Sequence, residues 1–101
     1  MLASQLLEQH RDEIKLIARK YELKGLCNLR VFGSVARGDD TEDSDIDFLV
    51  DVNSDLRPSL YTLIEMNNEL EDLLGIKVDL VSARSIPDLV KESIANEAVR
   101  L

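Results

Sequence analysis

The chain has 101 residues, a formal net charge of −8 at pH 7 and 45% hydrophobic residues. This length and composition predict one globular domain over residues 1–101. The single Cys27 excludes an internal disulfide, and no apolar run is long enough to span a membrane, so we expect a cytoplasmic protein without membrane contact. Binding of a long nucleic acid needs a basic surface, so this acidic chain is not expected to bind nucleic acid directly.

The apolar spacing predicts helices and strands that alternate along most of the chain. We expect, in chain order, a helix over 2–22, a strand over 28–34, one helical turn from Ser34 to about Gly38, a strand over 45–52, a helix from Pro58 that ends at Gly75, a strand over 76–81 and a last helix with Pro87 in its first turn. This order indicates an α/β (or α+β) fold, in which helices cover a small mixed sheet of three or four strands.

The segment between the first two predicted strands is strongly acidic. Seven carboxylates fall within the thirteen positions from Asp39 to Asp51. Like charges this crowded repel one another, and folding brings them together at a cost in free energy unless a cation compensates them. The acids before Asp45 are expected to form a solvated turn, and Asp51 lies too far along the strand to join a common site.

The strand that follows this segment holds two aspartates side by side. Side chains alternate along a strand, so Asp45 and Asp47 lie on one face and the apolar residues between and after them lie on the other. The same alternation places Asp79 on the polar face of the strand 76–81. If these two strands are neighbours, the three aspartates form a triad of hard oxygen ligands suited to Mg²⁺.

Gly33 and Ser34 supply a complementary feature. They end one predicted strand and begin a helical turn, where unpaired backbone N–H groups face outward and attract an anion. Glycine lets the backbone approach a phosphate closely, and the serine adds a hydroxyl donor. A Gly-Ser pair or a D-x-D pair alone is usually an ordinary turn or strand end. Their combination, without a basic cluster nearby to neutralise the acids, indicates phosphoryl or nucleotidyl transfer.

These residues resemble a known signature. Gly33-Ser34, ten further residues and then Asp45-Ile46-Asp47 are similar to the motif of the polymerase-beta-like nucleotidyltransferase superfamily, whose third acid on a later strand corresponds to Asp79. The extended pattern "GSVARG…SDIDFLV" in a short chain resembles the minimal nucleotidyltransferase (MNT) domains, over about residues 28–81. The resemblance implies the polymerase-beta-like nucleotidyltransferase fold and a role as the antitoxin partner of a HEPN-domain toxin.

The resemblance also implies a reaction and roles for the matching residues. Such a protein uses ATP and Mg²⁺, with two ions expected, to transfer AMP to a tyrosine hydroxyl of the toxin, as the antitoxin of a type VII-like pair. Asp45 and Asp47 would hold the metal ions, and Asp79 would complete the site and help to deprotonate the attacking hydroxyl. Gly33 and Ser34 would hold the nucleotide phosphates.

Arg37 has two alternative roles. It follows the Gly-Ser turn and is a candidate for a contact with a phosphate or with the partner. An ion pair with Asp39 or Asp40 at the end of the helical turn is the alternative. His10 and Cys27 are expected to pack in the fold, because no second histidine or cysteine motif accompanies them. The tyrosines Tyr21 and Tyr61 are expected to be helix-packing residues.

Two other functions stay open at this stage. A binding module could neutralise the toxin by forming a tight complex, with a metal site that performs no chemistry. Transfer of AMP to a small hydroxylated molecule, such as an aminoglycoside, is less favoured because the chain has no second domain to hold such an acceptor.

Overall fold

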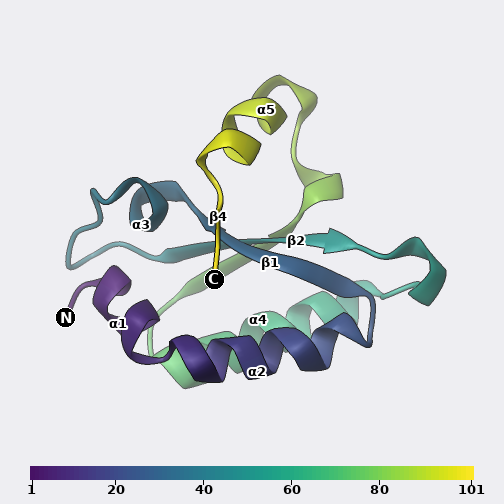
Figure 1. Ribbon diagram of the computed structural model, residues 1–101, viewed down its shortest axis with the longest axis horizontal. Coiled ribbons are helices and arrows are strands. Elements are labelled where there is room, and N and C mark those ends of the chain that lie inside the picture. Colours follow the sequence, from purple (N-terminus) through teal and green to yellow (C-terminus); the bar gives the residue numbers. More distant parts are fainter.

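The computed structural model describes all residues, 1–101, as a mixed sheet with helices on both faces (Figure 1). The helices are α1 (Ala3–Gln9), α2 (Arg11–Glu22), α3 (Gly33–Arg37), α4 (Leu60–Leu74) and α5 (Asp88–Glu97), and the strands are β1 (Leu26–Phe32), β2 (Ile46–Val52), β3 (Val78–Ser82) and β4 (Val99–Arg100). Short 3₁₀ turns cover Ser54–Leu56 and Ala83–Ser85. No helix is both long and apolar enough to cross a membrane.

The strand order in the sheet is β3-β2-β1-β4. Strand β1 pairs antiparallel with β2 and with β4, whereas β2 and β3 are parallel. Parallel neighbours need a crossover connection, which here is α4. The mixed sheet that the sequence predicts is therefore confirmed, with β4 as a fourth strand of only two residues.

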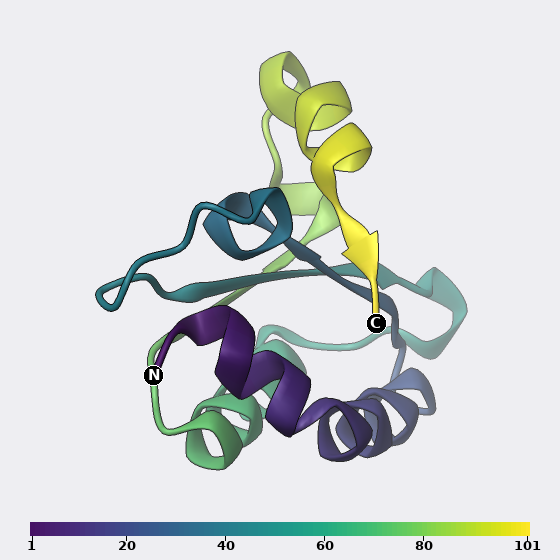
Figure 2. The same cartoon turned by 60° about the vertical axis from the view of Figure 1, so that its left-hand side comes forward.

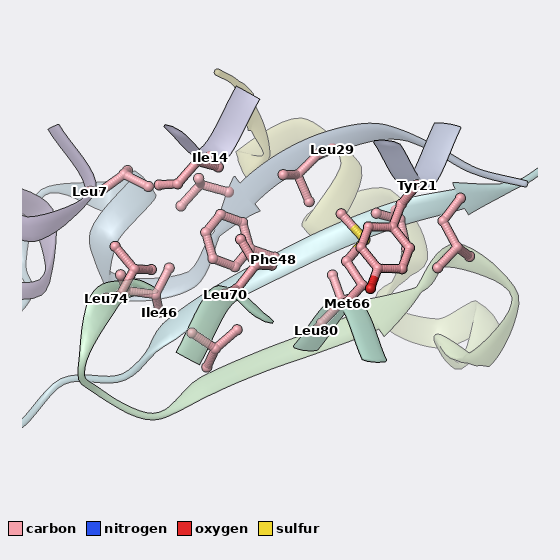
Figure 3. Close-up of a cluster of buried hydrophobic side chains, with 14 of the residues drawn as sticks. Leu7, Ile14, Tyr21, Leu29, Ile46, Phe48, Met66, Leu70, Leu74 and Leu80 are labelled. Atoms are coloured by element: carbon pink, nitrogen blue, oxygen red, sulfur yellow. The ribbon is translucent and has the colours of Figure 1, made fainter. Parts of the chain in front are cut away.

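The helices form two unequal layers around this sheet (Figures 1 and 2). Helices α1, α2 and α4 lie on one face, and the short α3 and the isolated α5 lie on the other. The core fills the space between the sheet and the first layer (Figure 3). Its fully buried side chains include Ile14 and Tyr21 from α2, Phe48 from β2, and Met66 and Leu70 from α4. These core contacts hold strand β2 on the face of the sheet that α2 and α4 cover.

The predicted helix over 2–22 is wrong in one respect, because the structure breaks it at His10. His10 has φ −110° and ψ 17°, outside the helical region, and it separates α1 from α2. The break allows each helix to turn its own apolar residues, Leu7 in α1 and Ile14 in α2, into the core. The half-buried imidazole of His10 lies beside Glu13, with 3.1 Å between Nδ1 and Oε1.

The strands predicted over 28–34, 45–52 and 76–81 are observed at Leu26–Phe32, Ile46–Val52 and Val78–Ser82, and the last two helices start later than expected. The packing of the last helix also differs from expectation. Strand β1 ends at Phe32, so Gly33 and Ser34 belong to α3 rather than to the strand. The prolines expected in the first turns of α4 and α5 lie just before those helices. Helix α5 forms, but it has no buried residue, and Leu89 is 96% exposed. The apolar spacing therefore predicts this helix correctly, but the apolar face of α5 does not pack on the sheet.

Candidate functional site

The two strand aspartates of the predicted triad are direct neighbours in the sheet. Asp47 of β2 and Asp79 of β3 occupy paired positions of the parallel ladder. Their flanking residues Phe48 and Leu80 are also paired and are buried in the core. Because side chains alternate along a strand, the two carboxylates lie together on the opposite face, which carries α3 and α5. Asp45 comes one residue before β2 and is two residues from Asp47.

Strand β3 is held in this register by side chains of α4. Asn67 accepts a hydrogen bond from the backbone N–H of Leu80 at 3.0 Å, and Glu71 accepts one from that of Val78 at 2.9 Å. These two N–H groups point outward from the edge strand, where no further strand pairs with them. The two bonds anchor the backbone on both sides of Asp79. Helix α4 thereby positions the third acid of the site.

Negative charge accumulates around Asp47. Its carboxyl is half-buried, and this burial raises its pKa above the ordinary value. The neighbouring carboxylates of Asp79, Asp45 and Glu97 raise the pKa further, whereas the guanidinium of Arg37 lowers it. Each of these acids disfavours a negative charge on its neighbour, so a bound cation would relieve the repulsion. Glu97 was not among the residues that the sequence singled out.

Two basic side chains approach the acids, although the sequence predicted no basic cluster here. The Nζ of Lys77 lies 3.9 Å from Oδ2 of Asp45, but both side chains are largely in solvent. The guanidinium of Arg37 reaches the site from the end of α3. These two cations offset only part of the charge of four carboxylates.

Gly33 and Asp47 are linked by close packing. Strand β1 places Phe32 opposite Asp47, and Gly33 follows as the first residue of α3. Gly33 has φ +76°, and a Cβ at this position would overlap Oδ2 of Asp47 and lie 3.1 Å from its Cγ. The glycine is therefore required on two grounds, a left-handed backbone and the space that the carboxylate fills. The sequence suggested only the approach of a phosphate.

Ser34 lies in the first turn of α3, directly beside this glycine. It is half-buried, and no side chain caps the start of the helix. The first N–H groups of a helix have no partner within the helix, so they are available to an anion. The predicted Gly-Ser turn and the predicted acids thus meet at one place in the fold.

Arg37 ends α3 and has two carboxylate partners. Its Nη1 lies 2.5 Å from Oε1 of Glu97, and its Nε lies 3.3 Å from Oδ2 of Asp39. The ion pair with Asp39 is one of the two partners considered from the sequence. The other, Asp40, instead accepts a hydrogen bond from the backbone N–H of Ser4 at 2.9 Å, which lowers the pKa of Asp40.

The donor set fits a divalent cation that is shared with a nucleotide. No group of three His, Cys, Asp or Glu side chains is placed so that it could hold a metal ion, so Asp45, Asp47 and Asp79 do not form a ready-made triad of ligands. Mg²⁺ is ordinarily held by one or two carboxylates together with substrate phosphates and water. The paired Asp47 and Asp79, with Asp45 beside them, supply hard oxygen donors next to the start of α3. The predicted metal role of these residues stays a prediction.

The residues expected only to pack give a mixed result. Tyr21 is fully buried, and its hydroxyl donates a hydrogen bond to Glu69 at 2.9 Å. Cys27 is half-buried, with its Sγ 3.6 Å from the carbonyl oxygen of Asp51. Tyr61 is 78% exposed, so the expectation that it packs in the fold is wrong. It lies in the first turn of α4, before the first buried residue of that helix, Met66.

The sequence-family model of the nucleotidyltransferase domain matches residues 8–101, almost the whole chain. The chain belongs to this nucleotidyltransferase family. It is an enzyme of that class, as the Gly-Ser turn and the paired aspartates indicate. The resemblance to minimal nucleotidyltransferases is confirmed as well, since a solved structure assigned to that group shares 37% identity, covers 94% of this chain and 95% of its own, and has a TM-score of 0.81.

Two further relatives of this nucleotidyltransferase are informative. The protein adenylyltransferase MntA of Thermococcus cleftensis (strain DSM 27260 / KACC 17922 / CL1) is 42% identical over 97 residues, which cover 93% of this chain and 96% of the relative. A crystal structure of a toxin–antitoxin with AMP-PNP matches with a TM-score of 0.73 and 25% identity, and covers 88% of this chain and 69% of that one. The chain thus resembles a protein adenylyltransferase along nearly its full length.

Proposed function

We propose that this nucleotidyltransferase transfers AMP from ATP to a tyrosine hydroxyl of a HEPN-domain toxin and thereby acts as its antitoxin. The observation that carries the proposal is the register pair of Asp47 and Asp79 beside the Gly33–Ser34 turn. A protein adenylyltransferase among the relatives and a toxin–antitoxin structure with AMP-PNP support the choice of an adenine nucleotide and of a toxin as the partner.

We assign the roles of the residues from the family resemblance, and their positions are compatible with these roles. Asp45 and Asp47 would hold Mg²⁺, with two ions expected, and a divalent cation there would neutralise phosphate charge and stabilise the attacking and leaving oxygens. The backbone at Gly33 and the hydroxyl of Ser34 hold the terminal phosphates at the start of α3. Arg37 contacts a phosphate from the other end of that helix.

The proposed reaction is an in-line displacement at the α-phosphorus. Asp79 takes the proton of the acceptor hydroxyl, whose oxygen forms a bond to the α-phosphorus. The bond between that phosphorus and the oxygen of the β-phosphate breaks, and pyrophosphate leaves. Asp79 suits this task because it is exposed on the site face, where an acceptor side chain can reach it. Because the Asp79 side chain is exposed, the partner would supply part of the acceptor's environment.

A labelling experiment tests the reaction type. The protein and its toxin are incubated with Mg²⁺ and ATP that carries ³²P at the α-position or at the γ-position. We expect label on the toxin from the α-position alone, and a loss of about a hundred-fold or more in the initial rate with Asp79→Asn. Asp72→Asn removes an exposed carboxylate of α4 and is the matched control. Label from the γ-position would indicate a kinase and contradict the proposal.

A further inference from the structure

Helix α5 is attached to the rest of the molecule at few points. It has no buried residue, and Leu89 and Val90 are 96% and 40% exposed. Its packing is mainly against α3, and it stands apart from the sheet in both ribbon views (Figures 1 and 2). Its C-terminal end is tied to the sheet by the two-residue strand β4, which pairs with β1. A helix held so weakly can change position at a small cost in free energy.

The strongest polar contact of α5 joins it to the candidate site. Glu97 is the last residue of α5, Arg37 is the last residue of α3, and their Oε1 and Nη1 atoms are 2.5 Å apart. The Glu97 side chain is only 20% exposed, although most of its helix is in solvent. With Asp39 at 3.3 Å, the guanidinium is already bonded to two carboxylates.

Glu97 is also a fourth acid near the proposed metal ligands. Its carboxylate raises the pKa of Asp47, as Asp79 and Asp45 do, so it lies within electrostatic range of the site. A nucleotide brings anionic phosphates to the start of α3, one helical turn from Arg37. Phosphate and Glu97 are both anions that a guanidinium binds well, so they compete for the same donor groups.

We propose that Glu97 is an internal competitor of the nucleotide for Arg37, so that binding of a nucleoside triphosphate releases α5 from α3. This inference rests on the proposed function and adds a residue that sets the affinity for the nucleotide. In the free protein, the Arg37–Glu97 pair holds α5 beside the site. When a phosphate takes the guanidinium, Glu97 loses its partner on α3, and α5 can pivot about the short strand β4 that follows it.

The test measures nucleotide affinity and the mobility of α5 in the same variants. Mg²⁺ with AMP-PNP is titrated into the wild-type protein, Glu97→Gln, Glu97→Asp and Glu92→Gln, and amide hydrogen exchange is followed over residues 88–97 and, as an internal reference, over α2. Glu97→Asp keeps the charge but shortens the side chain. Glu92→Gln removes the same charge from an exposed position of the same helix.

We expect both Glu97 variants to bind AMP-PNP about two- to five-fold more tightly, the range of a partly exposed ion pair. Exchange over α5 should be faster in these variants without nucleotide, and AMP-PNP should accelerate it in the wild-type protein and in Glu92→Gln only. Weaker or unchanged binding by the Glu97 variants, or α5 exchange that is insensitive to nucleotide in the wild-type protein, would overturn the inference. Tighter binding by Glu97→Gln alone would indicate a simple effect of charge and would overturn it too.

The two proposals can fail separately. If AMP-PNP releases α5 but no AMP reaches the toxin, the competition stands and the proposed reaction is wrong. If AMP reaches the toxin while α5 stays protected, the reaction stands and the competition is wrong.

Discussion

The contact between Gly33 and Asp47 predicts a large and specific effect of one added methyl group. Gly33 and Gly38 both have a positive φ, of +76° and +80°. A Cβ at Gly33 would overlap the Asp47 carboxylate, whereas a Cβ at Gly38 would have no heavy atom within 4 Å. Both substitutions meet the cost of a positive φ, but only Gly33→Ala adds an overlap with a neighbouring side chain.

The magnitudes follow from these surroundings. A left-handed conformation costs alanine about 1–2 kcal/mol, which is the full effect expected for Gly38→Ala. At Gly33 the overlap adds about 1–3 kcal/mol, a typical cost of overpacking, because the Asp47 side chain sits on a rigid strand and must shift. We thus expect Gly33→Ala to lower the free energy of unfolding by about 2–5 kcal/mol. The displaced carboxylate should also lose its proposed metal.

Urea unfolding of a double-mutant cycle measures the overlap directly. Asp47→Ala removes the atoms that the new Cβ would meet, apart from the Asp47 Cβ at 3.3 Å. In that background Gly33→Ala should cost no more than Gly38→Ala, which gives a coupling of about 1–3 kcal/mol. Equal effects of the two glycine substitutions in the wild-type background, or a coupling near zero, would refute the reasoning.

Three further substitutions test the electrostatics and the packing. Asp47→Asn should raise the free energy of unfolding of the metal-free protein near pH 7, because burial and the neighbouring acids raise the pKa of Asp47. The gain should shrink as the pH is lowered toward the ordinary value of 3.8, since the wild-type carboxyl then becomes neutral too. A constant difference across a pH series of urea unfolding curves would contradict this. Asn67→Ala leaves the N–H of Leu80 without its partner and should lower the free energy of unfolding by about 1–3 kcal/mol, with faster exchange of that amide by NMR; unchanged exchange would show that the bond is unimportant. Tyr21→Phe removes the hydrogen bond to Glu69 and should cost about 1 kcal/mol in thermal unfolding, whereas a stability equal to wild type would assign the role of Tyr21 to packing alone.

The fold and the aspartate pair were predictable because they depend on local patterns. Alternation along β2 separates Phe48 from Asp47, and the same alternation along β3 separates Leu80 from Asp79. A buried helix between two strands favours a parallel pair, which the structure confirms. Two short patterns of sequence thus sufficed to bring distant carboxylates to one face.

Three features of the structure were not predictable from local patterns, because they depend on how helices and strands are oriented after they form. Glu97 lies 60 residues from Arg37, and its helix shows no periodicity that would point its last residue toward α3. The overlap at Gly33 depends on the register between β1 and β2. The break at His10 arises because the core needs two helix directions where the apolar spacing suggests one. Such features come from tertiary packing, which a local pattern does not encode.

The most direct test of the central claim is the intact mass of the toxin partner. The purified protein is mixed with Mg²⁺, ATP and its candidate HEPN-domain toxin, and the double variant Asp45→Asn/Asp47→Asn is the control. The account predicts that the toxin gains one or more AMP masses with the wild-type protein and none with the variant. A stable complex of the two proteins without any gain in mass would contradict it and would indicate an antitoxin that acts by binding alone.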